Sequence, residues 1–434
     1  MIPTLIISII TFVAILASLF FFPKLKIGRI SISTYWVIAL IGAIILLSCS
    51  LAPIEEVFKQ LIADTKINPL KILVLFFSMT LISIFLDEFG LFNALAELTV
   101  RKAKGNQYIL FFAFYGLVAL LTIFTSNDIV ILTFTPFICF FCKRGHLNPL
   151  PYLIAEFTAA NTWSLMLIIG NPTNIFLATS ANIDFIEYVK VMALPTLCAG
   201  IVELGLIFIL FRKKLKEKIS VDHPEKILIE NKVLLVTGII HLLVCLVFLV
   251  ISSYIKMEMW LISAICALSL LVCTIFISFF MKKSQHYFLG AAKRLPYPLI
   301  PFFLSMFVIV VAFNYQGISS KIASFFGTNN VIWIYGYSSF IASNLINNIP
   351  MSILYSSISS SFTGTNYIKA TYASIVGSNI GAFLTPMGAL AGIMFTSLLN
   401  EHDVKFSFSN FIKYGTIISI PTISIALLML FVLL

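Results

Sequence analysis

Charged residues are scarce in this sequence of 434 residues. Only 11% of them are Asp, Glu, Lys or Arg, whereas 60% are apolar and 14% are aromatic. A soluble globular protein carries roughly 25% charged residues, so this chain cannot cover a water-facing surface with polar side chains. The composition therefore excludes a soluble enzyme, a nucleic-acid-binding protein and a disordered regulator. It indicates an all-α membrane protein that crosses the bilayer many times.

Common enzyme motifs are also absent. The chain has no HExxH, GxSxG, Walker A or GxGxxG pattern, so no hydrolase, protease or nucleotide-driven site is visible. We therefore expect no enzyme and no cofactor, and ATP would have to come from a partner ATPase subunit. The seven cysteines contain one CxxC pair, Cys139 and Cys142. For this pair we expect buried packing rather than metal or redox chemistry, and we expect no metal site.

Long apolar runs are what the sequence has instead. About 20 apolar residues are needed to cross a bilayer as a helix, and ten runs are predicted to be full spans. They are residues 4–22, 35–52, 70–86, 150–180, 191–211, 233–252, 258–281, 297–313, 369–399 and 409–433. We interpret the first run as a span and not as a cleaved leader, because it lacks a basic start.

Two further apolar runs, residues 108–142 and 330–361, are broken midway by polar residues. Each is predicted to be a re-entrant hairpin that returns to the side from which it entered. With both runs as hairpins, about three quarters of the Lys and Arg residues fall on one side of the membrane. Basic loops stay in the cytoplasm, so this side is predicted to be cytoplasmic. Both termini are then predicted to lie outside.

A basic linker at residues 212–232 divides the chain into two halves, residues 1–211 and 233–434. Each half has five spans and one hairpin, and the two halves have opposite orientations. This predicts an inverted repeat, which is typical of secondary transporters. Three pairs of segments recur in the same order: 86–90 with 313–317, 126–129 with 346–349, and 161–170 with 379–388.

Polar, Gly- and Pro-rich breaks interrupt four of the apolar runs. Backbone at membrane depth needs hydrogen-bond partners unless it lines a polar cavity, so broken helices near the bilayer midplane mark a binding site. The breaks are Thr125–Asp128, Gly170–Asn174, Ser343–Asn348 and Gly377–Gly388.

The breaks supply amide and hydroxyl side chains. These groups both donate and accept hydrogen bonds, which suits a small hydroxylated solute or a dehydrated ion. The alternative is interhelical hydrogen bonding, worth about 0.6 kcal/mol for each group. The predicted substrate- or ion-binding residues are Ser126, Asn127, Asp128, Asn161, Gly170, Asn171, Thr173, Asn174, Asn344, Asn347, Asn348, Ser378, Asn379 and Thr385.

Few carboxylates lie within the apolar runs, and charged groups at membrane depth are usually functional. Asp128 stands at the turn of the first hairpin, and its counterpart in the second half is the neutral Asn348. We predict that Asp128 carries the coupling proton or contacts the substrate, with helix capping as the alternative. Glu156 is the second candidate for proton coupling.

Other polar residues in the runs are predicted to be structural. For Asp87 and Glu88 we expect capping of an amphipathic stretch at residues 89–100. For Glu203 and His241 we expect partly exposed or hydrogen-bonded structural roles.

At the breaks the sequence resembles the ion-transporter superfamily. Within it, the likeness is to the arsenite permease (ArsB-like), sodium/proton antiporter (NhaD-like) and citrate transporter-like branches. The motifs that carry it are Asn127-Asp128 followed by LTFTP at 132–136, GNPTN at 170–174, SNLINNIPM at 343–351 and GSNIGAFLTPMGALA at 377–391. The resemblance implies a scaffold domain, a mobile transport domain that contains the hairpins, and, from related dicarboxylate carriers, a homodimer.

In the arsenite branch, the resemblance implies export of neutral arsenite or antimonite trihydroxide in exchange for protons. Asp128 matches the aspartate of that branch's first hairpin, and Asn347 and Asn348 match the paired asparagines of its second. The dicarboxylate branch has Ser-Asn-Thr at both tips. Here the third position is Asp128 in one tip and Leu345 in the other, which counts against a sodium-coupled dicarboxylate carrier.

We therefore predict a secondary transporter in the plasma membrane that moves a small inorganic or anionic solute with a coupling proton or Na⁺. Proton-coupled arsenite or antimonite efflux is the leading hypothesis. The alternatives are a sodium/proton antiporter and a carrier of small organic or inorganic anions such as citrate and dicarboxylates. The expected partners are the lipid bilayer, a second copy of the chain and an ATPase subunit that is not required for transport. No nucleic-acid partner is expected, because the basic residues lie at the ends of apolar runs.

Overall fold

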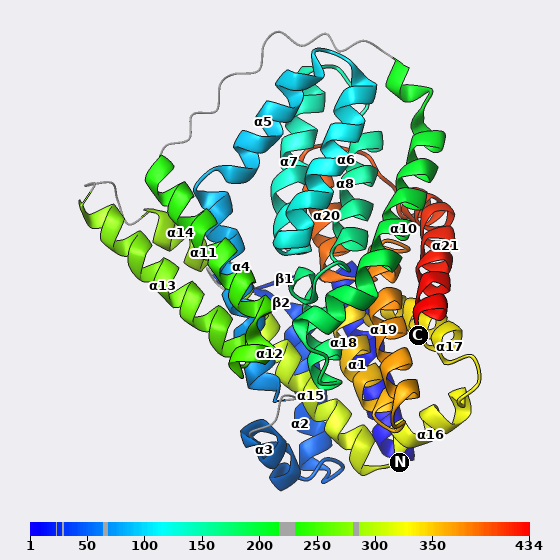
Figure 1. The fold of residues 1–434 in the computed structure, drawn as a ribbon. Helices are drawn as coiled ribbons and strands as arrows, with labels where there is room; N and C mark the ends of the chain where they lie inside the picture. The colour runs from blue at the N-terminus through cyan, green and yellow to red at the C-terminus, as the bar shows by residue number, and fades with distance from the viewer. Residues whose placement is uncertain (23, 28–29, 64–67, 217–230, 281–285) are drawn as a thin grey trace.

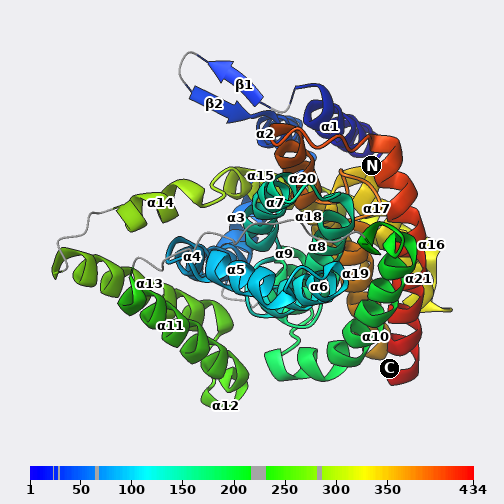
Figure 2. The same ribbon diagram turned by 90° about the horizontal axis from the view of Figure 1, so that it is seen from above.

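The protein is described by a computed structural model, drawn in Figure 1 and from above in Figure 2. It describes residues 1–22, 24–27, 30–63, 68–216, 231–280 and 286–434. Most of these residues are helical, as predicted. Of the predicted linker 212–232, residues 217–230 lie outside the described part.

Six of the ten predicted spans are long apolar helices. They are α4 (Pro69–Glu88), α10 (Phe185–Phe211), α11 (Lys232–Val250), α13 (Met259–Phe280), α15 (Leu299–Tyr315) and α21 (Phe408–Leu433). Two more spans, α1 (Ile2–Phe21) and α2 (Thr34–Ser48), contain shorter apolar helices. The start of α4 follows local chemistry: the side chain of Asn68 caps this helix by accepting from the backbone N–H groups of Leu70 and Lys71.

The other two predicted spans are each divided, as their polar breaks indicated. Residues 150–180 form α8 (Leu150–Trp163), the short 3₁₀ turn η1 (Ile168–Gly170) and α9 (Pro172–Ser180), and residues 369–399 form α19 (Thr365–Gly381) and α20 (Leu390–Glu401). Pro172 stands in the first turn of α9, where its missing N–H needs no partner. Asn171 caps that helix by accepting from the backbone N–H of Thr173 at 3.0 Å.

The predicted break at Gly377–Gly388 starts too early. Gly377 and Gly381 are still helical, and the unwound stretch is residues 382–389. These two glycines serve close packing rather than unwinding. A Cβ on Gly377 would lie 2.0 Å from the Ser339 hydroxyl, and one on Gly381 would lie 2.3 Å from that of Ser343.

The two predicted hairpins are pairs of helices. The first consists of α6 (Gln107–Phe124) and α7 (Asn127–Arg144), and the second of α17 (Val331–Ile346) and α18 (Asn348–Ser359). The break at Ser343–Asn348 is shorter than predicted, because α17 continues to Ile346 and Asn347 alone separates the two helices. Asn347 has φ +71° and ψ 153°, a conformation that non-glycine residues rarely adopt.

The prediction of an all-α chain misses one small sheet. Strands β1 (Lys24–Ile27) and β2 (Ile30–Ser33) pair antiparallel, with Lys24 opposite Ser33 and Ile27 opposite Ile30. Both strands alternate apolar and polar residues, the period that favours a strand. The remaining elements are short: α3 (Ile54–Ile62), α5 (Leu91–Ala103), α12 (Ser252–Ile255), α14 (His286–Arg294), α16 (Ile318–Phe326) and the 3₁₀ turn η2 (Lys214–Lys216).

The broken helices occupy the middle of the molecule. In Figure 2, α7, α8, α9, α18 and α19 lie at the centre, whereas α11 and α13 project to one side and α10 and α21 pair on the other. Helix α18 packs on both α9 and α19. The polar breaks of the two halves therefore come together in the interior.

Candidate functional site

Three side chains at the broken ends of α8, α9 and α19 form one hydrogen-bond network. The amide nitrogen of Asn379 donates to Oδ1 of Asn174 at 2.6 Å, and the Ser164 hydroxyl donates to Oδ1 of Asn379 at 2.8 Å. The amide of Asn174 in turn donates to the backbone carbonyl of Ser164 at 2.8 Å. All three residues are fully buried. We call Ser164, Asn174 and Asn379, together with Asn127 and Asn161, the asparagine network.

The first hairpin joins this network at the start of α7. The amide of Asn127 donates to Oδ1 of Asn161 at 3.3 Å, and the amide of Asn161 donates to the backbone carbonyl of Phe157 at 2.8 Å. The Ser164 hydroxyl lies 2.7 Å from the Asn161 carbonyl. The hairpin tip is therefore linked to α8, and through Ser164 to α19.

The second hairpin holds the unwound stretch at residues 382–389. Oδ1 of Asn344 accepts from the backbone N–H of Thr385 at 3.1 Å and from its hydroxyl at 2.7 Å. The amide of Asn347 donates to the carbonyl of Met387 at 3.1 Å, and the backbone N–H of Asn348 donates to the carbonyl of Gly388 at 3.0 Å. The unwound backbone thus finds its partners at this tip.

The two groups of contacts adjoin on α19. The amide of Asn344 donates to the carbonyl of Gly381 at 3.0 Å, and Gly381 comes two residues after Asn379. Gly170 and Gly388 allow the close approach of backbone at this centre. A Cβ on Gly170 would lie 2.3 Å from the carbonyl of Ser164, and one on Gly388 would lie 2.5 Å from that of Gly381.

Some polar atoms at the breaks are buried and unpaired. Within the part of the chain that the structure describes, Oδ1 of Asn127, Nδ2 of Asn171 and Oγ of Ser378 have no hydrogen-bond partner. Oδ1 of Asn171, by contrast, is paired with Thr173. A buried polar atom without a partner costs about 1–3 kcal/mol. A hydrogen-bond partner for any of these atoms would therefore stabilise the folded protein.

Asp128 lies in the first turn of α7, but outside the asparagine network. It is partly buried, and among the described residues it forms no hydrogen bond or ion pair. The N-cap of α7 is Ser126, whose buried side chain makes no capping bond either. Asp128 is near enough to Tyr35 on α2 for an electrostatic interaction. The alternative that Asp128 caps α7 is therefore wrong.

Glu156 also lies outside the network. It is buried between α7 and α8, and its two carboxylate oxygens accept from the Thr135 hydroxyl at 3.2 and 3.1 Å. Cys139 and Cys142 on α7 are buried too. The structure thus separates the two carboxylates predicted for proton coupling, and only Asp128 stands at a break.

Glu203 has the hydrogen-bonded role predicted for it. It is fully buried on α10 and accepts from the hydroxyls of Tyr115, at 3.2 Å, and Thr162. His241 is bonded as well, to the carbonyl of Thr237 at 2.8 Å and to the Ser269 hydroxyl at 3.1 Å.

The capping role predicted for Asp87 and Glu88 is wrong. The N-cap of α5 is Gly90, at φ +86°, and no side chain caps that helix. Asp87 instead contacts Nη2 of Arg294 at 2.5 Å and accepts from the Thr133 hydroxyl at 2.8 Å, and Glu88 contacts Nη1 of Arg294 at 2.9 Å. The left-handed turn at Gly90 leads α5 away, so both carboxylates bind α14 instead.

Ser164 was not among the predicted site residues, although its hydroxyl lies within 2.8 Å of both Asn161 and Asn379. One feature of the sequence indicated Ser164. Ser164 lies in the segment 161–170, which pairs with 379–388 in the predicted repeat.

The breaks and their flanking residues contain no cationic side chain. Residues 121–135, 161–175, 340–350 and 376–392 include no Lys, Arg or His. These four segments would offer a multiply charged anion only neutral N–H and O–H donors. The arrangement suits a neutral hydroxylated solute or a small cation better.

Known proteins resemble this chain over most of its length. The model of the citrate transporter family matches residues 30–361. The arsenical pump membrane protein of Escherichia coli (strain K12) is 25% identical over 367 residues, which cover 81% of this chain and 84% of that protein. The putative arsenical pump membrane protein of Bacillus subtilis (strain 168) is 27% identical over 423 residues, which cover 88% of this chain and 90% of that protein.

The fold is also similar to that of a solved structure. The crystal structure of the YdaH transporter from Alcanivorax borkumensis superposes with a TM-score of 0.53, covering 99% of this chain and 97% of that one. The sequence identity is 15%, so this likeness concerns the fold alone.

Proposed function

The chain belongs to the citrate transporter family, and from this premise we propose that it is a proton-coupled secondary transporter that exports arsenite or antimonite. One observation carries the choice of solute. Asn127 and Asn171 keep unpaired buried polar atoms at helix breaks whose surroundings contain no Lys, Arg or His. The names of the Escherichia coli and Bacillus subtilis relatives agree with this choice.

The chemistry of the solute fits these groups. Arsenite and antimonite are neutral trihydroxides, and each hydroxyl both donates and accepts a hydrogen bond. Oδ1 of Asn127 accepts and Nδ2 of Asn171 donates, so the hydroxyls of such a solute have the chemistry to pair with either atom. Such a solute brings no net charge into the interior of the protein and needs no cationic partner there.

The coupling proton is assigned to Asp128. It is the one carboxylate among the predicted site residues at the breaks, and no hydrogen bond or ion pair to a described residue holds it. A carboxylate without a fixed partner is available to bind and release a proton. Glu156, held by the Thr135 hydroxyl, is proposed to be structural.

Alternating access is proposed to follow from an inverted repeat of residues 1–211 and 233–434. Two matched features support the repeat. Gly90 is the N-cap of α5 and Gly317 is the N-cap of α16, both in the left-handed conformation, at φ +86° and +67°. These glycines fall at the same place in the paired segments 86–90 and 313–317.

The second matched feature is a contact between a span and a hairpin. Near the end of α4, Asp87 accepts from the hydroxyl of Thr133 on α7. Near the end of α15, Asn314 accepts from the hydroxyl of Ser357 on α18. In both halves, the third span thus binds the second helix of the hairpin. The orientation proposed from the basic residues, with the termini outside, and the proposed homodimer complete this picture.

Citrate is the second candidate solute, because the family description names it. A tricarboxylate needs strong donors, and the breaks offer neutral amides, hydroxyls and backbone N–H groups without a cation. A sodium/proton antiporter is the third candidate, since Asp128 and the carbonyls of residues 382–389 are hard oxygen ligands.

A flux panel tests the proposal. Inverted vesicles that contain the protein are given a pH gradient and then arsenite, antimonite, citrate or Na⁺, and uptake is measured against vesicles without the protein. We expect gradient-driven uptake of arsenite or antimonite. Uptake of citrate alone, or Na⁺-dependent proton movement without solute uptake, would overturn it.

A further inference from the structure

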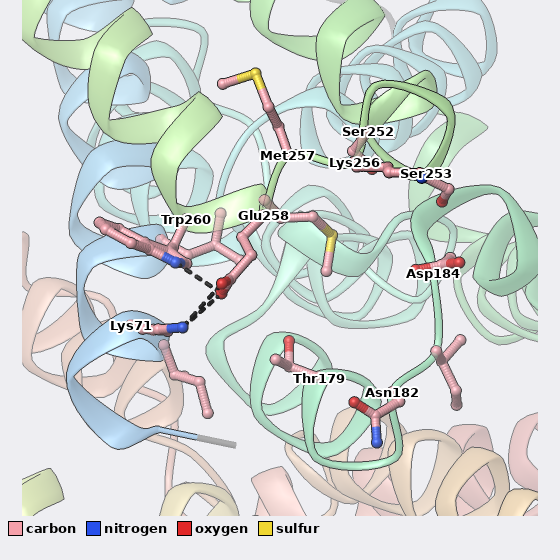
Figure 3. Close-up of a pocket in the computed structure, with 14 residues that line it drawn as sticks. Lys71, Thr179, Asn182, Asp184, Ser252, Ser253, Lys256, Met257, Glu258 and Trp260 are labelled. Carbon is pink, nitrogen blue, oxygen red and sulfur yellow. Dashed lines mark hydrogen bonds and ion pairs between the residues drawn. The ribbon is translucent and has the colours of Figure 1, made fainter. Parts of the chain in front are cut away.

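A cavity of about 330 Å³ lies away from the asparagine network, between the start of α4, the end of α9 and the α12–α13 connection (Figure 3). Figure 3 shows Lys71, Glu258 and Trp260 on one side of it. Asp184 and Ser253 lie across from them. The cavity thus has walls from segments far apart in the sequence.

The cavity has a built polar lining. Nζ of Lys71 lies 2.9 Å from both carboxylate oxygens of Glu258, and the indole N–H of Trp260 donates to Glu258 at 2.9 Å. Thr179 lines the cavity from α9, and its buried hydroxyl has no hydrogen-bond partner among the described residues. The wall of the cavity thus contains a polar group that no described residue satisfies.

A second, smaller cavity shares a wall with this one and lies beside residues that flank the breaks. It measures about 20 Å³ and is lined by Ile72, Pro172 and Ile349, among others. Ile72 lines the larger cavity as well. Pro172 follows Asn171 and Ile349 follows Asn348, so the small cavity reaches the breaks themselves. Ile72, which is 3% exposed, stands between the two spaces.

We propose that the larger cavity is a second solute-binding chamber at one mouth of the transport path, and that Ile72 closes it from the breaks. The chamber rests on the proposed function in one respect, namely that a solute crosses at the breaks. It lies at the start of α4 and the end of α9, at the opposite end of the molecule from the end of α10 and the start of α11 (Figure 1), which is the outer side in the proposed orientation.

The lining also indicates the class of solute. The charged residues around the chamber are two of each sign: Lys71, Lys256, Asp184 and Glu258. With no net charge, the chamber does not select for an anion. Hydroxyl, amide and indole groups complete the lining, so a small neutral hydroxylated solute fits it, as at the breaks.

Substitution of Ile72 tests the connection. In Ile72→Trp, the larger side chain fills the passage, and we expect flux to fall by roughly tenfold. Binding of the same solute to the purified protein should persist, because the breaks are intact. Val74→Trp is the control, since Val74 is on the same helix but 38% exposed.

The flux comparison of Ile72→Trp uses any solute of the panel that the wild-type protein transports. The proposed function and the proposed chamber can therefore be refuted independently of each other. Wild-type flux of citrate alone would overturn the proposed function and leave the comparison of Ile72→Trp with Val74→Trp readable. Equal flux in these two variants, with any solute, would overturn the proposal that the chamber lies on the transport path.

Thiol labelling tests where the chamber opens. In a background with the seven native cysteines replaced by serine, Thr179→Cys and Ser253→Cys are each treated with a membrane-impermeant thiol reagent. Both residues line the cavity, and Ser253 is exposed. We expect both to react in intact cells, Ser253→Cys faster. Reaction of either only after the cells are opened would overturn the assignment of this mouth to the outer side.

Discussion

Asn379 donates a 2.6 Å hydrogen bond to Asn174, a residue 205 positions earlier in the chain. This bond ties the last turn of α19 to the first turn of α9, at the breaks of the two halves. Both side chains are fully buried. The geometry at the centre therefore depends on a contact between the halves, which makes it a natural place to test the site.

Asn379→Ala removes this contact. Oδ1 of Asn174 loses its partner in the interior, at a cost of about 1–3 kcal/mol, whereas the Ser164 hydroxyl keeps the carbonyl of Asn161 as an acceptor. We expect initial rates of solute uptake to fall by roughly 5- to 100-fold in vesicles that contain equal amounts of protein. Asn410→Ala is the matched control, because Asn410 is exposed. Equal losses in the two variants would contradict the role of Asn379.

Asp128→Asn removes the proposed proton carrier while it keeps the size of the side chain. We expect uptake no longer to respond to an imposed pH gradient, because the amide cannot carry the proton. Glu156→Gln is the comparison, since Glu156 is held by Thr135 away from the breaks. The measurement is the ratio of uptake with and without the gradient. A ratio that collapses in Glu156→Gln and survives in Asp128→Asn would reverse the assignment.

Gly377→Ala forces apart two packed helices. The new Cβ would lie 2.0 Å from the Ser339 hydroxyl and 2.3 Å from the carbonyl of Gly336 on α17. Overpacking of this kind costs about 1–3 kcal/mol, so the melting temperature in detergent should fall. Gly116→Ala is the control on α6, because its Cβ would meet no atom within 4 Å. In Gly116→Ala, the gain in helix propensity should leave the melting temperature equal to or higher than that of the wild-type protein. A lower value in both variants would refute the packing argument.

Arg294→Ala leaves two carboxylates on α4 without their cation. Asp87 is 6% exposed and keeps only the Thr133 hydroxyl, and Glu88 is 16% exposed. We expect a loss of about 1–3 kcal/mol in the free energy of unfolding, read as a lower melting temperature. Because Arg294 is itself 31% exposed, the lower part of that range is expected.

The double variant Asp87→Asn with Arg294→Ala is the control for this ion pair. It removes the buried charge together with its partner, so it should recover most of the lost stability. A double variant that is less stable than Arg294→Ala would show that Asp87 is needed for another reason.

The long apolar helices could be predicted because the length of an apolar run is a local property of the sequence. The helix starts at Pro69 and Lys232 differ by one residue from the predictions, since caps such as Asn68 act within one turn. The breaks were predictable for the same reason: residues 125–126 and Asn171 are polar within apolar runs.

What the sequence could not indicate depends on contacts between distant elements. Gly377 and Gly381 looked like helix breakers, but a glycine that packs against α17 stays helical. Asp87 looked like a cap, and its partner Arg294 lies 207 positions later. The role of Ser164 depended on where Asn379 would be placed, which no local pattern contains.

The two hairpin tips differ in backbone energy. Ser126, at the first tip, is extended at φ −89°, whereas Asn347, at the second, has φ +71° and ψ 153°. A non-glycine residue in that region stores about 1–3 kcal/mol. If the second tip relaxes when the protein faces the other side of the membrane, the two orientations differ in free energy even without solute. A difference of this size would populate one orientation roughly 5- to 150-fold over the other. The empty carrier would then rest facing one side, and Asn347→Gly would bring the two resting populations closer together.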